Sequence, residues 1–132
     1  MIAILQKSPE IEVYQHLRVA CGLSAKLDEA VQIGLSATLF AVMALDENKP
    51  IGMGRVVGDG GCFCQVVDIC VLPEYQGQGI GKRIMQNISA YLDQLPESCY
   101  ISLLADGKAD QLYAQFGFKD TLPNAKGMFI KK

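Results

Sequence analysis

Residues 68–83 read DICVLPEYQGQGIGKR and combine an apolar run, a proline and three alternating glycines. Residues 68–72 are rich in β-branched side chains and Pro73 closes them, which predicts the end of a buried strand. An apolar stripe at helical spacing begins directly after the glycines, with Ile80, Ile84, Ile88, Leu92 and Leu95. The sequence therefore predicts a strand, a glycine loop and a helix in direct succession.

The glycine loop has the features of an anion site. Glycine tolerates positive φ and has no Cβ, so that consecutive backbone N–H groups can converge on one anion. The helix that follows adds a positive end of about half a charge, and its first N–H groups have no partner inside the helix. A turn without a ligand is the alternative, but the direct start of a helix with no other N-cap favours a phosphate site.

Two common phosphate motifs do not fit the spacing. A P-loop needs glycine where Gln76 stands and Ser or Thr where Arg83 stands. A dinucleotide fingerprint that begins at Gly77 needs a glycine in place of Lys82. Both motifs are therefore excluded.

A third pattern fits. Gln76, Gly79 and Gly81 match [R/Q]-x-x-G-x-[G/A] after a strand that ends in V-x-P, and this resembles the acetyl-coenzyme A signature of the GCN5-related N-acetyltransferase (GNAT) superfamily. Residues 103–118 contain L-x-A-D-x(6)-Y-x-x-x-G-F, which is similar to the last motif of that superfamily. The stretches GMGRVVGD and KGMF also resemble small bacterial members related to plant plastid serotonin N-acetyltransferases, which acetylate arylalkylamines.

The order of the elements predicts one mixed α/β domain over residues 1–132. Strands are expected at 1–6, 39–45, 50–58, 62–72 and 99–105, with a closing hairpin of 118–121 and 128–131. Helices are expected at 9–21, 24–35, 80–95 and 109–116, the first two capped by Ser8 and Ser24. The right-handed crossover through 80–95 makes strands 62–72 and 99–105 parallel. The resemblance implies a twisted sheet whose parallel central strands splay apart, with helices on both faces.

The resemblance also implies where acetyl-coenzyme A binds. The thioester arm would lie in the splayed gap and bond to the backbone of Ile69 and Val71, on either side of Cys70. The diphosphate would lie on the N–H groups of the loop, which are those of Gln76, Gly77, Gln78, Gly79, Ile80 and Gly81. Lys82 and Arg83 would neutralise the phosphates or, alternatively, form only a solvated start of the helix.

Transfer of an acetyl group to an amine requires a neutral amine, whereas an alkylamine with a pKa of about 10.4 is protonated at pH 7. A base is therefore useful, and so is an acid for the departing thiolate. Tyr113 matches the acid tyrosine of the family, with a core aromatic as the alternative. Asp106 is the base candidate, with an N-cap as the alternative. Asp68 competes for the base role, unless it forms a structural pair with Arg55, and water is a third base.

Composition limits the partners and the compartment. A net charge of −2 argues against nucleic acid and anionic membranes as partners, and no apolar run is long enough to cross a membrane. Five cysteines and a single histidine, His16, give no metal-site spacing and no nucleophile triad. Cys62, Cys64, Cys70 and Cys99 are expected to be reduced core residues, and the protein is expected in the cytoplasm.

These features predict an acetyl-coenzyme A-dependent N-acetyltransferase that acts directly on a small primary amine, arylalkylamine or polyamine-like. The alternatives are a protein-lysine or N-terminal acetyltransferase and a non-catalytic acyl-coenzyme A sensor. Residues 1–35 match the family only in their helical pattern, and acceptor specificity would lie there. The resemblance further implies a possible homodimer.

Overall fold

Five strands form one sheet in the order β1-β2-β3-β4-β5 in the computed structural model, which describes residues 1–132. The strands from β1 to β4 pair antiparallel, and β5 joins β4 in parallel. This confirms the predicted mixed α/β class. The strands are β1 (Ile2–Leu5), β2 (Phe40–Asp46), β3 (Lys49–Gly58), β4 (Phe63–Val71) and β5 (Tyr100–Ser102).

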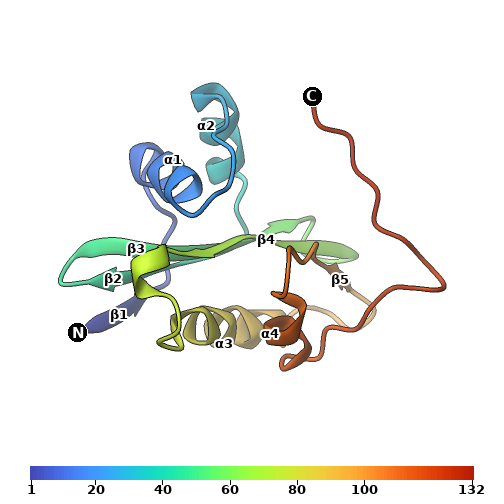
Figure 1. The fold of residues 1–132 in the computed structure, drawn as a ribbon. Coiled ribbons are helices and arrows are strands. Elements are labelled where there is room, and N and C mark those ends of the chain that lie inside the picture. The colour runs from blue at the N-terminus through green and yellow to red at the C-terminus, as the bar shows by residue number, and fades with distance from the viewer.

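Helices cover both faces of this sheet (Figure 1). One face carries α1 (Ile11–Ala20) and α2 (Asp28–Ser36), and the other carries α3 (Ile80–Leu92) and the short α4 (Asp110–Ala114). The main core lies under α3, which buries Ile80, Ile84, Met85 and Ile88. Gly54 on β3 makes this close packing possible, because a Cβ there would lie 2.9 Å from the Ile88 Cδ1 atom and 2.5 Å from the Ile69 Cδ1 atom.

The parallel pair of strands separates after three residue pairs. Phe63, Cys64 and Gln65 face Tyr100, Ile101 and Ser102, and β4 then continues to Val71 without a partner on the β5 side. Because β4 separates from β5 at this point, residues 103–105 have no strand to pair with. β5 is therefore shorter than the predicted strand at 99–105. The splayed gap implied by the resemblance is therefore present.

A β-bulge accompanies the separation. Met53 faces Cys70 and Arg55 faces Val67, so that Asp68 and Ile69 together oppose a single residue of β3. Asp68 has φ +62°, a left-handed conformation that is uncommon for a residue with a side chain. A bulge bends its strand and increases the local twist, which turns the second half of β4 away from β5.

The predicted helix caps and the predicted hairpin were wrong. α1 begins after Glu10 and α2 after Leu27, and neither has a side-chain cap. The loop that contains Ser24 is held instead by hydrogen bonds to Gln15 and Arg18. Residues 118–132 form no strand, and the chain after Phe118 leaves the body as an extended tail (Figure 1). β5 is only three residues long and offers a short edge, so the tail lacks a ladder to join.

The prediction that four cysteines lie in the core holds only in part. Cys64 and Cys70 are buried, Cys99 is half-buried and Cys62 is exposed, because it precedes the first residue of β4 in a turn. All five cysteines of the chain are free thiols. None of the helices combines the length and the apolar character that a membrane span requires.

Candidate active site

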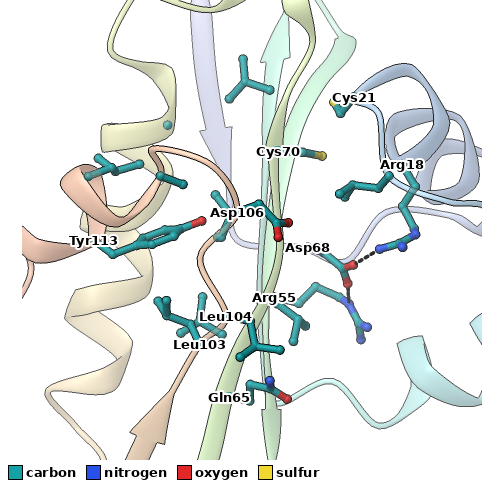
Figure 2. Close-up of a pocket in the computed structure, with 18 of the residues that line it drawn as sticks. Arg18, Cys21, Arg55, Gln65, Asp68, Cys70, Leu103, Leu104, Asp106 and Tyr113 are labelled. Atoms are coloured by element: carbon teal, nitrogen blue, oxygen red, sulfur yellow. Dashed lines mark hydrogen bonds and ion pairs between the residues drawn. The ribbon is translucent and has the colours of Figure 1, made fainter. Parts of the chain in front are cut away.

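A cavity of about 1300 Å³ opens where β4 leaves β5 (Figure 2). Its walls come from the second half of β4, the glycine loop, α1 and the loop after it, and the segment from Leu103 to α4. Pockets for one small ligand usually have volumes of about 300–1,000 Å³. The cavity is therefore large enough to hold parts of two substrates at once.

The open edge of β4 presents backbone polar groups to this cavity. The Leu72 N–H donates to the Ile51 carbonyl at 2.8 Å, toward β3, so the Val71 carbonyl of the same peptide points to the other side. There it accepts a hydrogen bond from Gln76 Nε2 at 3.1 Å. Ile69 lies two residues earlier, and both residues line the cavity. A ligand with its own amide could bond to this edge as a neighbouring strand would.

The glycine loop has the geometry of an anion seat. Gly77 and Gly79 have φ of +80° and +79°, conformations that side chains oppose. The Arg83 N–H makes the first helical bond, 3.1 Å to the Gly79 carbonyl, so the three amides before it have no helical partner. The first turn of α3 contains no acidic residue. Its amides and the positive helix end thus remain available to an anion.

The predicted coenzyme residues occupy two positions relative to the cavity. Those that line it are Ile69, Cys70, Val71, Gln76, Gly77 and Gly81. Gln78, Gly79, Ile80 and Lys82 lie outside its lining, in the loop and the first turn of α3. The first group faces the gap, whereas in the second group the side chain of Ile80 is buried in the core.

The two basic residues at the start of α3 differ in what they contact. Both terminal nitrogens of Arg83 donate to the Ile2 carbonyl on β1 at 3.3 Å. This contact favours the structural alternative for Arg83. Lys82 is exposed beside the loop. Of the two, Lys82 is therefore the better placed to approach a phosphate.

Tyr113 on α4 is a core aromatic that also lines the cavity. Its ring is buried and packs edge-on against Phe118, with ring centroids 6.4 Å apart. Its hydroxyl points into the cavity (Figure 2). Burial raises the pKa of Tyr113 above its usual value, and the charge of Asp106 and the thiol of Cys70 raise it further. The hydroxyl therefore stays protonated and can donate a proton.

Asp106 follows β5 and also lines the cavity. The alternative role as an N-cap is not realised, because α4 begins after Ala109 and has no side-chain cap. Only the Asp106 carbonyl bonds to this segment, accepting from the Ala109 N–H at 3.0 Å. The carboxylate is left free to accept a proton from a ligand.

Asp68 is held by three side chains. Its Oδ1 accepts from Arg18 Nη1 at 2.6 Å, and its Oδ2 accepts from Arg55 Nε and from the Tyr14 hydroxyl, both at 2.8 Å. Its side chain is 5% exposed. The pKa of Tyr14 is raised by burial and then by the charge of Asp68. The bond from Arg55 favours the structural alternative. The bonds from Arg18 and Tyr14 also tie α1 to the sheet.

Arg18 and Tyr14 were not predicted as site residues, although both contact Asp68. They stand four residues apart on α1, a spacing that places both side chains on one face of a helix. Tyr14, Arg18 and Cys21 all line the cavity. A basic residue on the otherwise apolar face of α1 was the signal that could have located this wall of the site.

Asp68→Asn is expected to lower the free energy of unfolding by about 2–3 kcal/mol, because the amide leaves the buried Arg18 and Arg55 without a negative partner. Chemical denaturation measures this change. The matched control is Asp110→Asn on the exposed surface of α4, which should change the free energy of unfolding by under about 0.5 kcal/mol. Equal stability of the two variants would show that the network does not hold α1 in place.

The chain is similar to several known proteins in sequence and in structure. Residues 37–120 match the family model described as an acetyltransferase (GNAT) domain. A crystal structure from Staphylococcus aureus, described as a protein of unknown function and probable acetyltransferase, is 47% identical with a TM-score of 0.94, and the match covers 100% of both chains. An acetyltransferase of the GNAT family from Streptococcus pneumoniae is 29% identical over 100% of this chain and 98% of that one, with a TM-score of 0.82.

A curated plant relative matches over a shorter stretch. GCN5-related N-acetyltransferase 2, chloroplastic, from Arabidopsis thaliana is 39% identical over 83 residues, which is 63% of this chain and 32% of the relative. The chain thus spans about a third of the length of the first curated relatives that it matches. The likeness to these relatives concerns the part of the molecule that contains the glycine loop.

Proposed function

Because the chain belongs to the GCN5-related N-acetyltransferase (GNAT) family of transferases, whose members use acetyl-coenzyme A, we propose that it moves the acetyl group directly to a primary amine of a small molecule. The observation that carries this proposal is a single cavity that joins four features. They are the glycine loop, the open edge of β4, the Tyr113 hydroxyl and the Asp106 carboxylate.

The residues fit acetyl-coenzyme A as cosubstrate. The free amides of the loop and of the first turn of α3 suit a diphosphate, with Lys82 near it. The pantetheine amides suit the open backbone of Ile69 and Val71. When bound, the thioester supplies an activated acetyl group. Gln76 Nε2 donates a hydrogen bond to the Val71 carbonyl. A pantetheine amide would have to displace this bond or share the carbonyl oxygen with it.

The chemistry then needs two proton transfers. The neutral amine nitrogen attacks the thioester carbonyl carbon, the C–S bond breaks and an amide bond forms. We assign Asp106 to accept the proton that the amine loses and Tyr113 to donate a proton to the departing sulfur. The raised pKa of Tyr113 keeps its hydroxyl protonated through the neutral range, which is the form that can donate a proton.

A small acceptor is favoured by the loop between α1 and α2, which forms one wall. Gln15 Nε2 donates to the Lys26 carbonyl, the Lys26 N–H donates back to Gln15 Oε1 at 3.0 Å, and Arg18 Nε donates to the Ser24 carbonyl at 2.8 Å. Leu23 and Lys26 from this pinned loop line the cavity. A fixed wall at this position leaves less room for an extended peptide than for a compact amine.

Asp106→Asn is expected to lower kcat about a hundredfold near neutral pH, since an amide cannot accept the proton that the amine loses. Stability should be unchanged, because the carboxylate makes no cap that could be lost. Steady-state kinetics at neutral pH check this. An unaltered kcat would indicate that water, and not Asp106, is the base.

The proposal is tested by thiol release from acetyl-coenzyme A across a panel of amines and lysine peptides, together with calorimetry of coenzyme binding. We expect binding, and thiol release with small amines. Binding without release on any acceptor would instead indicate a sensor, and release with peptides alone would indicate a protein acetyltransferase. Absence of binding at millimolar coenzyme would defeat the proposal.

Two smaller proposals complete the account. A homodimer stays a prediction, supported by three exposed apolar residues of the C-terminal tail: Met128, Phe129 and Ile130, which are 87%, 82% and 93% exposed. A cytoplasmic location also stays a prediction, and five free thiols support a reducing compartment.

A further inference from the structure

Two arginines in the acceptor wall of the cavity keep unused hydrogen-bond donors. Arg55 bonds through Nε to Asp68 and through Nη1 to the Gly34 carbonyl and the Thr38 hydroxyl. Arg18 bonds through Nε and Nη1 only. In each guanidinium the Nη2 nitrogen has no partner within the chain.

These two nitrogens keep some accessible surface. Arg18 and Arg55 are 9% and 8% exposed as whole residues, and both line the cavity. No fully buried side-chain nitrogen or oxygen of the chain lacks a hydrogen-bond partner. The unpaired Nη2 atoms must therefore reach accessible space.

The charge of this region is also unbalanced. Two guanidinium groups share the single carboxylate of Asp68 and lie over the ring of Tyr14, which leaves one positive charge without a carboxylate partner in a largely buried position. Lys26 and Lys108 add two more cations to the cavity lining, against one further carboxylate, that of Asp106. Buried charge is costly unless it is paired, so a negatively charged ligand would stabilise this cluster.

We propose that the acceptor amine also carries an oxyanion, a carboxylate or a phosphate, which Arg18 and Arg55 bind through their free Nη2 groups. This inference rests on the proposed function, since it names the class of amine. Arginine suits the role because its planar fork makes charge-assisted hydrogen bonds to both kinds of oxyanion. Of the predicted acceptors, polyamines fit least, because they bring only positive charge.

The arrangement gives the substrate a direction. Figure 2 shows Tyr113 on one side of β4 and the Arg18–Asp68 pair on the other. An acceptor bound with its oxyanion at α1 would extend its amine toward the gap where the thioester lies. The positive cluster would also disfavour an ammonium ion nearby and so favour the neutral amine that the reaction needs.

Matched pairs of amines test the proposal: tyramine with tyrosine, ethanolamine with O-phosphoethanolamine, and glucosamine with glucosamine 6-phosphate. We expect kcat/KM for the anionic member of at least one pair to exceed that of its neutral partner at least tenfold, and which pair responds separates carboxylate from phosphate. Equal or lower values in all three pairs would overturn the anion subsite and leave the acetyltransferase proposal intact.

A variant and a binding measurement localise the effect. Arg18→Lys keeps a positive charge beside Asp68 but loses the planar fork, and we expect the ratio of anionic to neutral kcat/KM to fall at least fivefold. Lys7→Gln is the control, because Lys7 is exposed and does not line the cavity, and it should leave the ratio within twofold. An unchanged ratio in Arg18→Lys would contradict the assignment.

Calorimetry keeps the inference testable if that variant does not fold or if no amine is turned over. 3-(4-Hydroxyphenyl)propanoate, which carries the anion but no amine, should bind the wild-type protein at least tenfold more tightly than 4-ethylphenol. Raising the salt concentration should weaken only the former. Equal affinities would overturn the subsite whether or not the protein is an acetyltransferase.

Discussion

Tyr113→Phe is expected to lower kcat a hundred- to ten thousandfold while leaving the affinity for acetyl-coenzyme A nearly unchanged. The substitution removes only the hydroxyl, and the buried ring can still pack edge-on against Phe118. Stability should therefore change little. Steady-state kinetics on a responsive amine and calorimetry of coenzyme binding measure the two effects separately.

Tyr91→Phe is the matched control. Tyr91 is a tyrosine on α3 that stacks on Phe40 with ring centroids 4.7 Å apart, and it does not line the cavity. Its loss of a hydroxyl should leave kcat within twofold. A fully active Tyr113→Phe enzyme would show that solvent, and not Tyr113, protonates the departing sulfur.

The pH dependence of the wild-type enzyme carries a related expectation. An acid works while it is protonated, and the folded pKa of Tyr113 is raised above the ordinary value of about 10. The acid step should therefore persist as the pH rises through the range where an ordinary tyrosine ionises, and fail only above the raised pKa.

Gly81→Asp is expected to abolish detectable binding of acetyl-coenzyme A. Gly81 lies in the first turn of α3 and lines the cavity, so a carboxylate there would repel the diphosphate. The fold should tolerate the change, because Gly81 does not have positive φ and a Cβ would lie 3.5 Å from the Leu112 Cδ2 atom, an ordinary contact. An acidic residue in the first turn also stabilises a helix.

Gly81→Asn separates charge from bulk, since it has nearly the same shape and no charge. We expect it to weaken binding less than Gly81→Asp, with thermal unfolding of both variants close to wild type. Gly79 is a poorer site for this test, because its φ of +79° would strain any side chain and confuse lost binding with lost stability. Wild-type affinity in Gly81→Asp would place the diphosphate elsewhere.

The sequence predicted the sheet and the loop well because their signals are local. The apolar run that ends at Pro73, the alternating glycines and the helical stripe from Ile80 each depend on neighbouring residues only. The parallel pairing of β4 and β5 followed from the helical crossover between them. The resemblance, in turn, implied the splayed gap.

The other features depend on contacts between distant segments. The ion pair between Asp68 and Arg18 joins residues 50 positions apart, and no local sequence pattern predicts it. The bulge that gives Asp68 its positive φ appears only in the register between β3 and β4. The tail was mistaken for a hairpin because its apolar pattern suits a strand, whereas strand formation requires a partner edge.

A mass balance of one reaction tests the central claim of direct acetyl transfer most directly. Wild-type protein, acetyl-coenzyme A and a responsive amine are mixed, and free thiol, N-acetylated amine and the mass of the protein are followed together. The account predicts one N-acetylated amine for each thiol released, no release without amine and no acetylated protein during turnover. Thiol release without amine, or an acetyl group on the protein that later passes to the amine, would contradict it.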